Sequence, residues 1–400
     1  MASKRILTAR VSVNMVTSDP VYTADDQLLL PEGTVLTEEI ISALKDHSVF
    51  AIRFKVDDKD GRTPIWGGDE EEEENAGEDA KQAVPVEEIQ YAPKEPSYEV
   101  EENIEEKNYF EEIRDTVEYK EFNAAFLNTV EHLKDVFNRV VMQNEMIDSE
   151  SILQEVEAVV AKSRNSLHIL DMLQCMRGYD DVTYVHSMNV ALLSNVIGKL
   201  AIPDISKEDL DVLTLAGLLH DIGKMLVPDN VLQKKDRLTI SEFNIVKTHV
   251  LHGNNIVKGM GLDPRVAEVA MRHHERCDGS GYPGGYRSSQ IDDFSKIVAI
   301  ADTYDAMTSD RIYRKAICPF DVIHMFEREG LLKYEVKFLL PFLSTAVQAY
   351  MNTEVYLTTD EIGKVVMVNA KELSKPIIKV GSTYYDLTKE STISIDRIID

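Results

Sequence analysis

The sequence has little cysteine and no long apolar run, and both shortages narrow its class. Its three cysteines are widely spaced and include no CxxC pair, so neither a disulfide framework nor a cysteine zinc site is supported. No window holds the roughly eighteen consecutive apolar residues that a membrane span needs, and the first residues lack the apolar stretch of a signal peptide. We therefore expect reduced thiols, no membrane segment and a cytoplasmic location.

Positive charge is also scarce, since 43 Lys and Arg stand against 70 Asp and Glu and give a formal net charge of −27. Because a nucleic-acid polymer binds to a basic face, this balance argues against such a partner. Half of the excess lies in residues 57–107, where 19 acidic residues stand against 5 basic ones. This segment is also spotted with proline and poor in apolar residues, so we predict a disordered acidic linker.

The chain as a whole has enough apolar residues for packed domains, since 44% of its 400 residues are hydrophobic. Residues 1–56 alternate apolar and polar around one short helical pattern, which predicts a small α/β or β-rich module. Residues 108–345 have helical periodicity almost throughout. Residues 352–400 return to short β-branched runs between turn signals, which predicts a small β appendage. The predicted fold class is therefore mainly α.

Six of the ten histidines fall between positions 186 and 274. A single histidine on an apolar face is most often a hydrogen-bonded core residue, but here aspartates accompany the histidines. His186 lies on the apolar face of one predicted helix, and His220 and Asp221 end another, which has Ser206 as its N-cap. A carboxylate and an imidazole at the end of so apolar a helix cost free energy to bury unless they are paired or bind a cation.

Three further predicted helices carry similar groups. His249 lies in a helix that begins with a capping box at 239–242, His273 and His274 follow a helix opened by an Asp-Pro pair, and Asp302 lies on an apolar helix. Because neighbouring helical residues project about 100° apart, the two adjacent histidines could reach around one ion or toward two. Imidazole and carboxylate donors without thiolate suit moderately hard cations and argue against structural zinc. We predict a two-metal site.

Five motifs occur in order: YVHSMNV around His186, HDIGK at 220–224, THVLHG around His249, HHERCDGSGYP at 273–283 and ADTYDAMTSDRIYR at 301–314. On these motifs the chain resembles the HD-GYP branch of the HD phosphohydrolases over roughly residues 160–320. The resemblance implies an HD-type helical bundle that binds two or three metal ions and hydrolyses cyclic di-GMP.

The resemblance also implies roles for single residues. The implied metal ligands are His186, His220, Asp221, His249, His273, His274 and Asp302, with Asp221 bridging the ions. Asp221 and Lys224 are the implied catalytic residues, and Lys224 would also contact the reactive phosphate. His252 matches no ligand position.

Substrate contacts are implied at Arg311 and Arg314 and at a lip formed by Gly281, Tyr282 and Pro283, where a protein partner could also bind. The glycines of this loop equally suit a tight turn, and both interpretations stay open. Relatives with three metals carry a glutamate one turn before the first histidine, where this chain has Val182. We therefore expect two divalent metals, iron or manganese.

The ligand set indicates a mechanism without a nucleophilic side chain. Two cations that bridge a water can lower its pKa from about 15.7 toward neutrality and provide hydroxide in line with a phosphodiester. The ions and Lys224 would neutralise charge that develops on the phosphoryl oxygens. Linear pGpG and GMP both stay open as products, and the acid that protonates the leaving oxygen is not identified.

Two rival functions remain. Because metal ions would contact the phosphates and not the bases, the substrate could be another cyclic dinucleotide such as cyclic GMP-AMP. Alternatively, the domain could be a regulatory scaffold that binds a nucleotide or a partner without turnover, although all seven ligand positions are kept. The amphipathic helices predicted in 108–165 either pack on the core or form a homodimer seam.

Overall fold

The computed structural model describes residues 3–7, 11–22, 28–46, 51–55, 108–143, 145–146, 148–176, 182–234, 236, 238–310 and 315–399. The predicted acidic linker at 57–107 lies outside the described residues. Arg311 and Arg314, predicted to bind substrate, also lie outside them.

The N-terminal residues form a small α/β module with its own core. Strand β1 (Ser3–Leu7) pairs antiparallel with β4 (Ala51–Lys55), β2 (Val21–Tyr22) pairs with β3 (Leu28–Leu30), and α1 is Glu38–Asp46. The buried apolar residues of the module are Met15, Val21, Leu30, Leu36, Leu44, Ile52 and Phe54. The prediction of a small N-terminal α/β module is confirmed.

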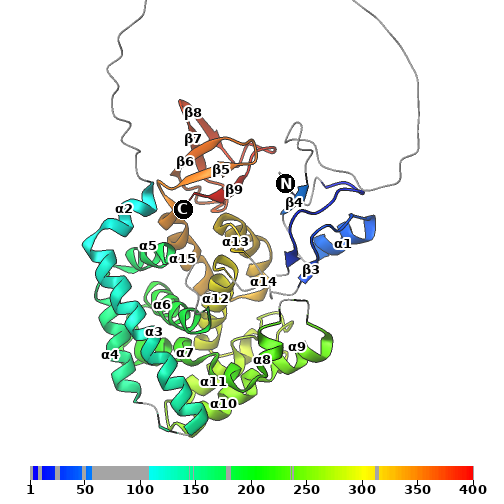
Figure 1. Ribbon diagram of the computed structural model, residues 1–400. Helices are drawn as coiled ribbons and strands as arrows, with labels where there is room; N and C mark the ends of the chain where they lie inside the picture. The colour runs from blue at the N-terminus through cyan, green and yellow to red at the C-terminus, as the bar shows by residue number, and fades with distance from the viewer. Residues whose placement is uncertain are drawn as a thin grey trace, which may run out of the picture.

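A helical region follows and forms the body of the molecule (Figure 1). Its helices, in chain order, are α2 (Tyr109–Asp115), α3 (Val117–Gln143), α4 (Ser149–Val160), α5 (Ser166–Cys175), α6 (Val182–Ala201), α7 (Lys207–Leu219), η2 (Ile222–Leu226), α8 (Asp229–Leu232), α9 (Ile240–Lys247), α10 (His249–Gly259), α11 (Pro264–Arg272), η3 (Ser288–Gln290), α12 (Asp293–Thr308), α13 (Pro319–Met325), η4 (Phe326–Gly330), α14 (Leu331–Lys333), α15 (Val336–Ala346) and η5 (Val347–Tyr350). The mainly α fold class is confirmed.

Helices α6, α7 and α12 form the centre of this region. Helix α6 packs against α7, α12 and α15, and α11 packs against α7 and α12. Nearly every residue of α12 is buried, as is most of the second half of α7. A helix that is apolar on all sides is expected inside a protein, where other helices surround it. Polar groups on these helices are therefore held away from bulk water.

The predicted helix starts agree with the structure. Ser206 accepts a hydrogen bond from the backbone N–H of Asp209, and Asp263 caps α11 with Pro264 in its first turn. Thr239 forms the expected capping box with Glu242 at the start of α9. These caps satisfy backbone N–H groups that a helix leaves without an internal partner.

One predicted helix is divided in the structure. The helix that starts at the capping box ends at Lys247, and His249 begins the next helix, α10, instead of continuing the first. The break allows η2 to approach α10 closely. A Cβ atom on Gly223 would lie 2.0 Å from the carbonyl oxygen of His249 and 2.4 Å from the nitrogen of Gly253. Only glycine fits this position, and the close approach places the end of α7 against His249.

The chain ends in a five-stranded antiparallel sheet of order β8-β7-β6-β5-β9, made of β5 (Glu354–Leu357), β6 (Ile362–Met367), β7 (Ile377–Val380), β8 (Thr383–Asp386) and β9 (Ile395–Ile398). The predicted β appendage is confirmed. Its buried residues Val355, Val365 and Ile378 belong to the same core as the helices. The Arg53 guanidinium donates to both carboxylate oxygens of Asp396, which links β4 of the N-terminal module to β9.

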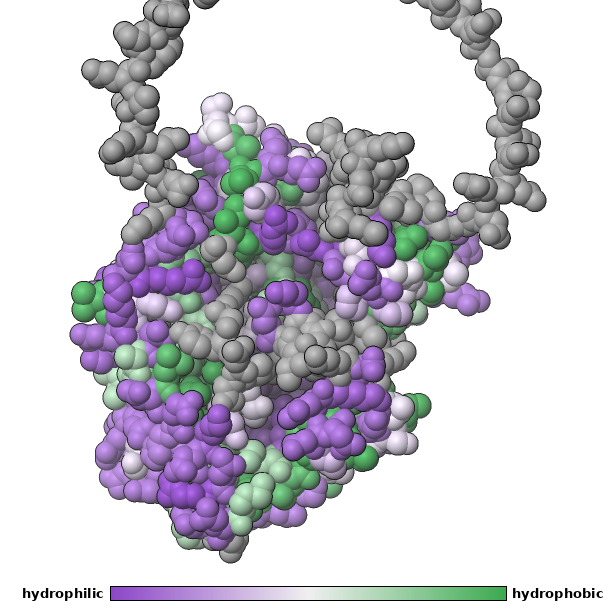
Figure 2. Space-filling view, in the orientation of Figure 1, coloured by the Kyte–Doolittle hydropathy of each residue, from purple (hydrophilic) through white to green (hydrophobic). Residues whose placement is uncertain are grey.

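No helix in the described part of the chain is long and apolar enough to cross a membrane. The face of the molecule drawn in Figure 2 is mainly hydrophilic, with separate hydrophobic patches.

Candidate metal centre

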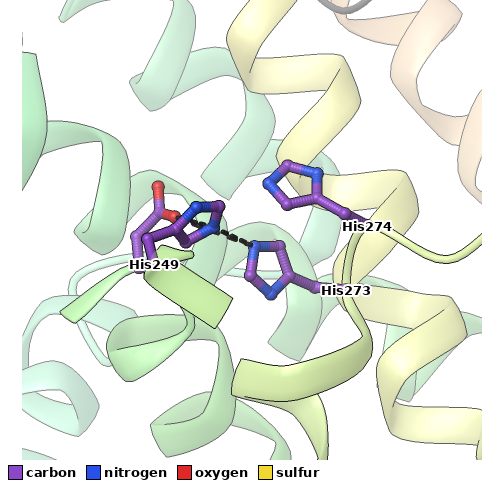
Figure 3. Close-up of side chains that lie close together, drawn as sticks. His249, His273 and His274 are labelled. Carbon is purple, nitrogen blue, oxygen red and sulfur yellow. Dashed lines mark hydrogen bonds and ion pairs between the residues drawn. The ribbon is translucent and has the colours of Figure 1, made fainter. Parts of the chain in front are cut away.

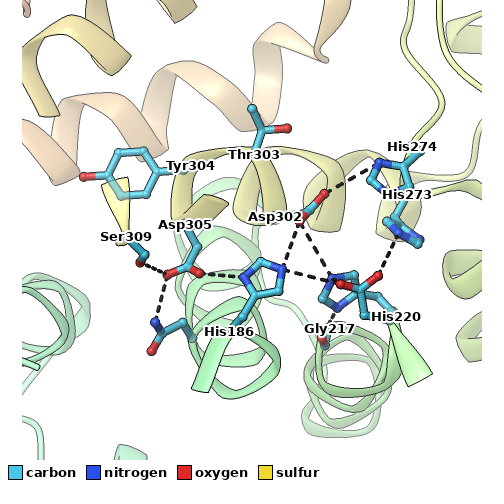
Figure 4. Close-up of polar contacts among 12 residues, drawn as sticks. His186, Gly217, His220, His273, His274, Asp302, Thr303, Tyr304, Asp305 and Ser309 are labelled. Atoms are coloured by element: carbon cyan, nitrogen blue, oxygen red, sulfur yellow. Dashed lines mark hydrogen bonds and ion pairs between the residues drawn. The ribbon is translucent and has the colours of Figure 1, made fainter. Parts of the chain in front are cut away.

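Helix ends and buried helix faces bring the predicted metal ligands together (Figure 4). His186 lies on α6, His220 and Asp221 follow α7, His249 begins α10, His273 and His274 follow α11, and Asp302 lies on α12. They form two groups, Asp221 with His249, His273 and His274, and His186 with His220 and Asp302. In each group, one donor atom of every residue lies within 4.8 Å of the others. All seven predicted side chains therefore belong to one of these two groups.

Asp221 connects the two groups. Its Oδ1 lies 3.4 Å from Nε2 of His249 and 3.7 Å from Nε2 of His273. Its Oδ2 lies 3.2 Å from Nε2 of His220 and 3.6 Å from Nε2 of His186. Each carboxylate oxygen thus faces one group, which is the arrangement expected of a bridging ligand.

The outer nitrogens of three imidazoles are fixed by backbone carbonyls. Nδ1 of His220 lies 2.8 Å from the carbonyl oxygen of Gly217, Nδ1 of His249 lies 2.7 Å from that of Val246, and Nδ1 of His273 lies 3.1 Å from that of Val269. A carbonyl can only accept, so each Nδ1 carries the proton and donates. In the neutral ring Nε2 is then unprotonated and presents a lone pair.

These lone pairs converge without a protein donor to receive them. Nε2 of His249 and Nε2 of His273 lie 3.3 Å apart (Figure 3). Nε2 of His220 and Oδ1 of Asp221 are buried and have no hydrogen-bond partner among the residues that the structure describes. Buried acceptors that face one another are costly unless a cation lies between them, so the donor set fits divalent metal ions.

The carboxylates of the centre stay charged although they are buried. Burial opposes charge on Asp221, but the neighbouring Lys224 ammonium opposes this effect, and the pKa of its carboxyl is held well below the usual value. Burial also opposes charge on Asp302, but the neighbouring His186, whose Nε2 lies 3.1 Å from Oδ1, offsets this effect, and the pKa of that carboxyl stays well below its usual range.

The imidazoles of His249, His273 and His274 stay neutral for the opposite reason. Burial lowers the pKa of His249 to about 4 and that of His273 to about 3, and it holds the pKa of His274 well below 6.5. Charged carboxylates and neutral imidazoles are the protonation states in which these side chains bind metals. The folded chain therefore presents them ready for a cation near neutral pH.

The residues of the centre differ in exposure. The side chains of His220 and His273 are 0% exposed, whereas those of His274 and Lys224 are 19% and 27% exposed. The Lys224 ammonium pairs with Oδ2 of Asp221 at 2.5 Å. Lys224, predicted to contact the reactive phosphate, is therefore partly exposed and lies beside the carboxylate of Asp221.

The loop after His274 closes over the centre. The ring of Tyr282 stacks on that of His274, with centroids 4.6 Å apart. A Cβ atom on Gly281 would lie 2.4 Å from the carbonyl oxygen of His274, so only glycine permits this approach. Pro283 is exposed. The loop is thus both a tight turn and a lip beside the metal centre, and its two predicted interpretations are compatible.

Glu275 holds this loop in place, a role that the sequence did not reveal. Its buried carboxylate accepts hydrogen bonds from the backbone N–H groups of Gly284 at 2.6 Å and of Tyr286 at 2.9 Å. The residue follows the two histidines directly, but only the folded loop brings the two N–H groups to it.

Asp305 is a second functional candidate that we did not predict. Its Oδ2 accepts a hydrogen bond from Nδ1 of His186 at 2.6 Å, and its Oδ1 accepts from Nδ2 of Asn189 at 2.8 Å and from the hydroxyl of Ser309 at 3.1 Å (Figure 4). The carboxylate thereby fixes His186 with Nε2 toward the centre. The sequence signal that could have identified Asp305 is its position three residues after Asp302.

His252 belongs to neither group of metal-capable residues.

A helical domain that directs five imidazoles and two carboxylates into one buried centre defines a class of domain with a histidine-aspartate metal site. Within that class, residues 178–336 match the HD domain family. The paired histidines and the GYP loop are the features by which this segment resembles the HD-GYP branch of that family.

Curated relatives match parts of the chain. A cyclic di-GMP phosphodiesterase of Pseudomonas aeruginosa is 34% identical over 239 residues, which cover 58% of this chain and 55% of the relative. A cyclic di-GMP phosphodiesterase response regulator of Xanthomonas campestris is 40% identical over 127 residues, 31% of this chain and 34% of the relative. A 3'3'-cGAMP-specific phosphodiesterase of Vibrio cholerae is 36% identical over 147 residues, 37% of this chain and 34% of the relative.

The chain thus spans about half or less of the length of these relatives. Among solved structures, an HDG"Y"P protein from Bdellovibrio bacteriovorus matches with a TM-score of 0.48 and 16% identity, over 85% of this chain and 98% of that one.

Proposed function

We propose that the helical region is a metal-dependent phosphodiesterase that hydrolyses cyclic dinucleotides, with cyclic di-GMP as the first substrate to test. The observation that carries the proposal is the position of Asp221, whose two oxygens face two groups of inward-directed imidazole nitrogens. Relatives named as cyclic di-GMP phosphodiesterases support the choice of substrate.

The proposed site holds two divalent metal ions, iron or manganese. One ion would be held by His249, His273 and His274 and the other by His186, His220 and Asp302, with Asp221 shared between them. When bound, the ions supply Lewis acidity toward the phosphoryl oxygens and acidify the attacking water. The position one turn before His186 is Val182, which offers no ligand for a third ion.

The side chains have distinct tasks in this proposal. The backbone carbonyls behind His220, His249 and His273 keep their Nε2 atoms available, and Asp305 does the same for His186. The Lys224 ammonium stabilises negative charge on the phosphoryl oxygens, because it is partly exposed beside Asp221. The product is linear pGpG, with GMP as a further product.

A second candidate substrate is 3'3'-cGAMP, because two of the Vibrio cholerae relatives are named as specific for it. The exposed Pro283 of the GYP loop is also the place where we propose that a partner protein could bind. Homodimer formation stays a prediction.

The test is hydrolysis by anaerobically purified protein reconstituted with Mn²⁺ or Fe²⁺, with cyclic di-GMP and 3'3'-cGAMP as parallel substrates and the metal content counted. We expect turnover at about two metals per chain and its loss in Asp221→Asn, because the shared carboxylate is removed. Turnover of 3'3'-cGAMP alone would replace the substrate. A fully metallated protein that hydrolyses neither compound would contradict the proposal and favour a non-catalytic scaffold.

A further inference from the structure

A lysine outside the predicted motifs lies at the mouth of the metal centre. Lys247 ends α9, and its Nζ lies 4.4 Å from the ring centroid of Phe243 and 4.9 Å from that of Tyr282. The two rings meet edge to face with centroids 6.4 Å apart. Since Tyr282 also stacks on His274, a continuous row of contacts leads from a proposed metal ligand to the ammonium group.

No carboxylate of a described residue pairs with the charge of Lys247. It forms no ion pair with any residue that the structure describes. Other lysines nearby are engaged, since Lys234 pairs with Glu242 at 2.7 Å and Lys224 pairs with Asp221. In a chain with a net charge of −27, a half-buried cation without a carboxylate partner beside the metal centre is available for an anion.

The two aromatic rings hold this cation in place. An ammonium group over an aromatic ring is attracted by the negative face of the ring. Phe243 lies one helical turn before Lys247 on α9, and Tyr282 belongs to the loop that Gly281 and Glu275 hold beside the centre. A side chain that is already oriented loses less entropy when it binds a ligand than a free surface lysine does.

A cyclic dinucleotide provides the matching anion. It carries two phosphodiesters in one ribose–phosphate ring, so a substrate with one phosphodiester at the metal ions must place the other nearby but outside the metal centre. We propose that Lys247 binds this second phosphodiester and thereby favours cyclic dinucleotides over simple diesters. The inference rests on the proposed function and adds a substrate-binding residue to it.

The experiment compares two substrates in the full-length, metal-loaded protein: cyclic di-GMP, with two phosphodiesters, and bis(p-nitrophenyl) phosphate, with one. In Lys247→Met we expect KM for cyclic di-GMP to rise about tenfold with little change in kcat, because a charge-assisted contact is lost. The ratio of kcat/KM for cyclic di-GMP to that for the simple diester should fall by a similar factor. Lys247→Arg should restore most of the loss.

The matched control is Lys258→Met, which removes an exposed lysine from the neighbouring helix α10. It should leave both substrates unaffected. Added salt should raise KM for cyclic di-GMP more in the wild type than in Lys247→Met, because salt screens the interaction that the variant lacks.

The outcomes separate this inference from the proposed function. If the wild type hydrolyses cyclic di-GMP and Lys247→Met has an unchanged KM, or loses both substrates equally, the inference fails and the phosphodiesterase stands. If the wild type hydrolyses only the simple diester, the proposed substrate is wrong and the inference fails with it.

Discussion

Replacing Asp305 should weaken metal binding although Asp305 is not itself a proposed ligand. Its carboxylate accepts from three donors, Nδ1 of His186, Nδ2 of Asn189 and the hydroxyl of Ser309. In Asp305→Asn the amide has one oxygen for these donors. If its NH₂ group faces His186, two donors oppose each other, and if it faces Asn189, the amide of Asn189 must also turn so that its oxygen accepts.

The expected loss follows from this conflict. His186 would no longer have a firm acceptor at Nδ1, so the tautomer with a free Nε2 would lose its preference. Removing a partner of this kind typically costs about 10–100-fold in metal affinity, which corresponds to about 1.4–2.7 kcal/mol. The fold should survive, because asparagine has nearly the shape of aspartate.

The assay is a titration of metal-free protein with Mn²⁺ in competition with a fluorescent chelator. The matched control is Asp293→Asn, which changes an exposed aspartate in the first turn of the same helix, α12, and should leave metal affinity unchanged. Thermal unfolding of both metal-free variants tests whether they are folded. A folded Asp305→Asn protein that binds Mn²⁺ within about twofold of the wild type would refute the reasoning.

Two further predictions concern stability. Gly223→Ala should lower the free energy of unfolding by about 1–3 kcal/mol and weaken metal binding, because the new Cβ would meet the backbone of His249 and Gly253. Gly259→Ala is the control, since a Cβ at Gly259 would have nothing within 4 Å. Equal urea midpoints for the two variants would contradict the argument. Burial raises the pKa of Asp171 from 3.8 to about 7, and its Oδ1 has no hydrogen-bond partner. Because the folded-state pKa lies above the unfolded one, this group costs increasing stability as pH rises from about 4 to about 7. In urea unfolding at pH 8, the free energy of unfolding of Asp171→Asn should therefore be higher than that of the wild type by on the order of 1–2 kcal/mol, a value discounted because the group is partly exposed. The difference should vanish near pH 4. A difference independent of pH would show the sign argument to be wrong.

The inner part of the site could be predicted because its residues are close to strong local signals. His220 and Asp221 end an apolar helix, and His273 and His274 precede a glycine-rich loop, so polar groups stood out where burial was expected. Asp305 had the right spacing from Asp302, but its role depends on which side chain of α6 it meets. That pairing joins residues 119 positions apart, and helical periodicity carries no information about it.

The break after Lys247 could not be predicted for a similar reason. The capping box at Thr239 marks where α9 starts, but no local signal marks its end. The break coincides with the packing of Gly223 against the backbone of His249 and Gly253, a contact between η2 and α10. Tertiary contact, and not local propensity, decides this boundary.

The break at Thr248 has a consequence for the proposed function. It places His249 at the first turn of α10, facing Asp221, and leaves Lys247 at the end of α9, facing Tyr282. His249 and Lys247 are separated by a single residue in the sequence, but they point to different parts of the site. His249 faces the metal centre, and Lys247 faces the ring of Tyr282. A single continuous helix would hold their side chains about 200° apart around one axis. The separate helices instead allow each to be oriented by its own neighbours, so a substitution at Lys247 can alter substrate binding without disturbing the ligand at His249.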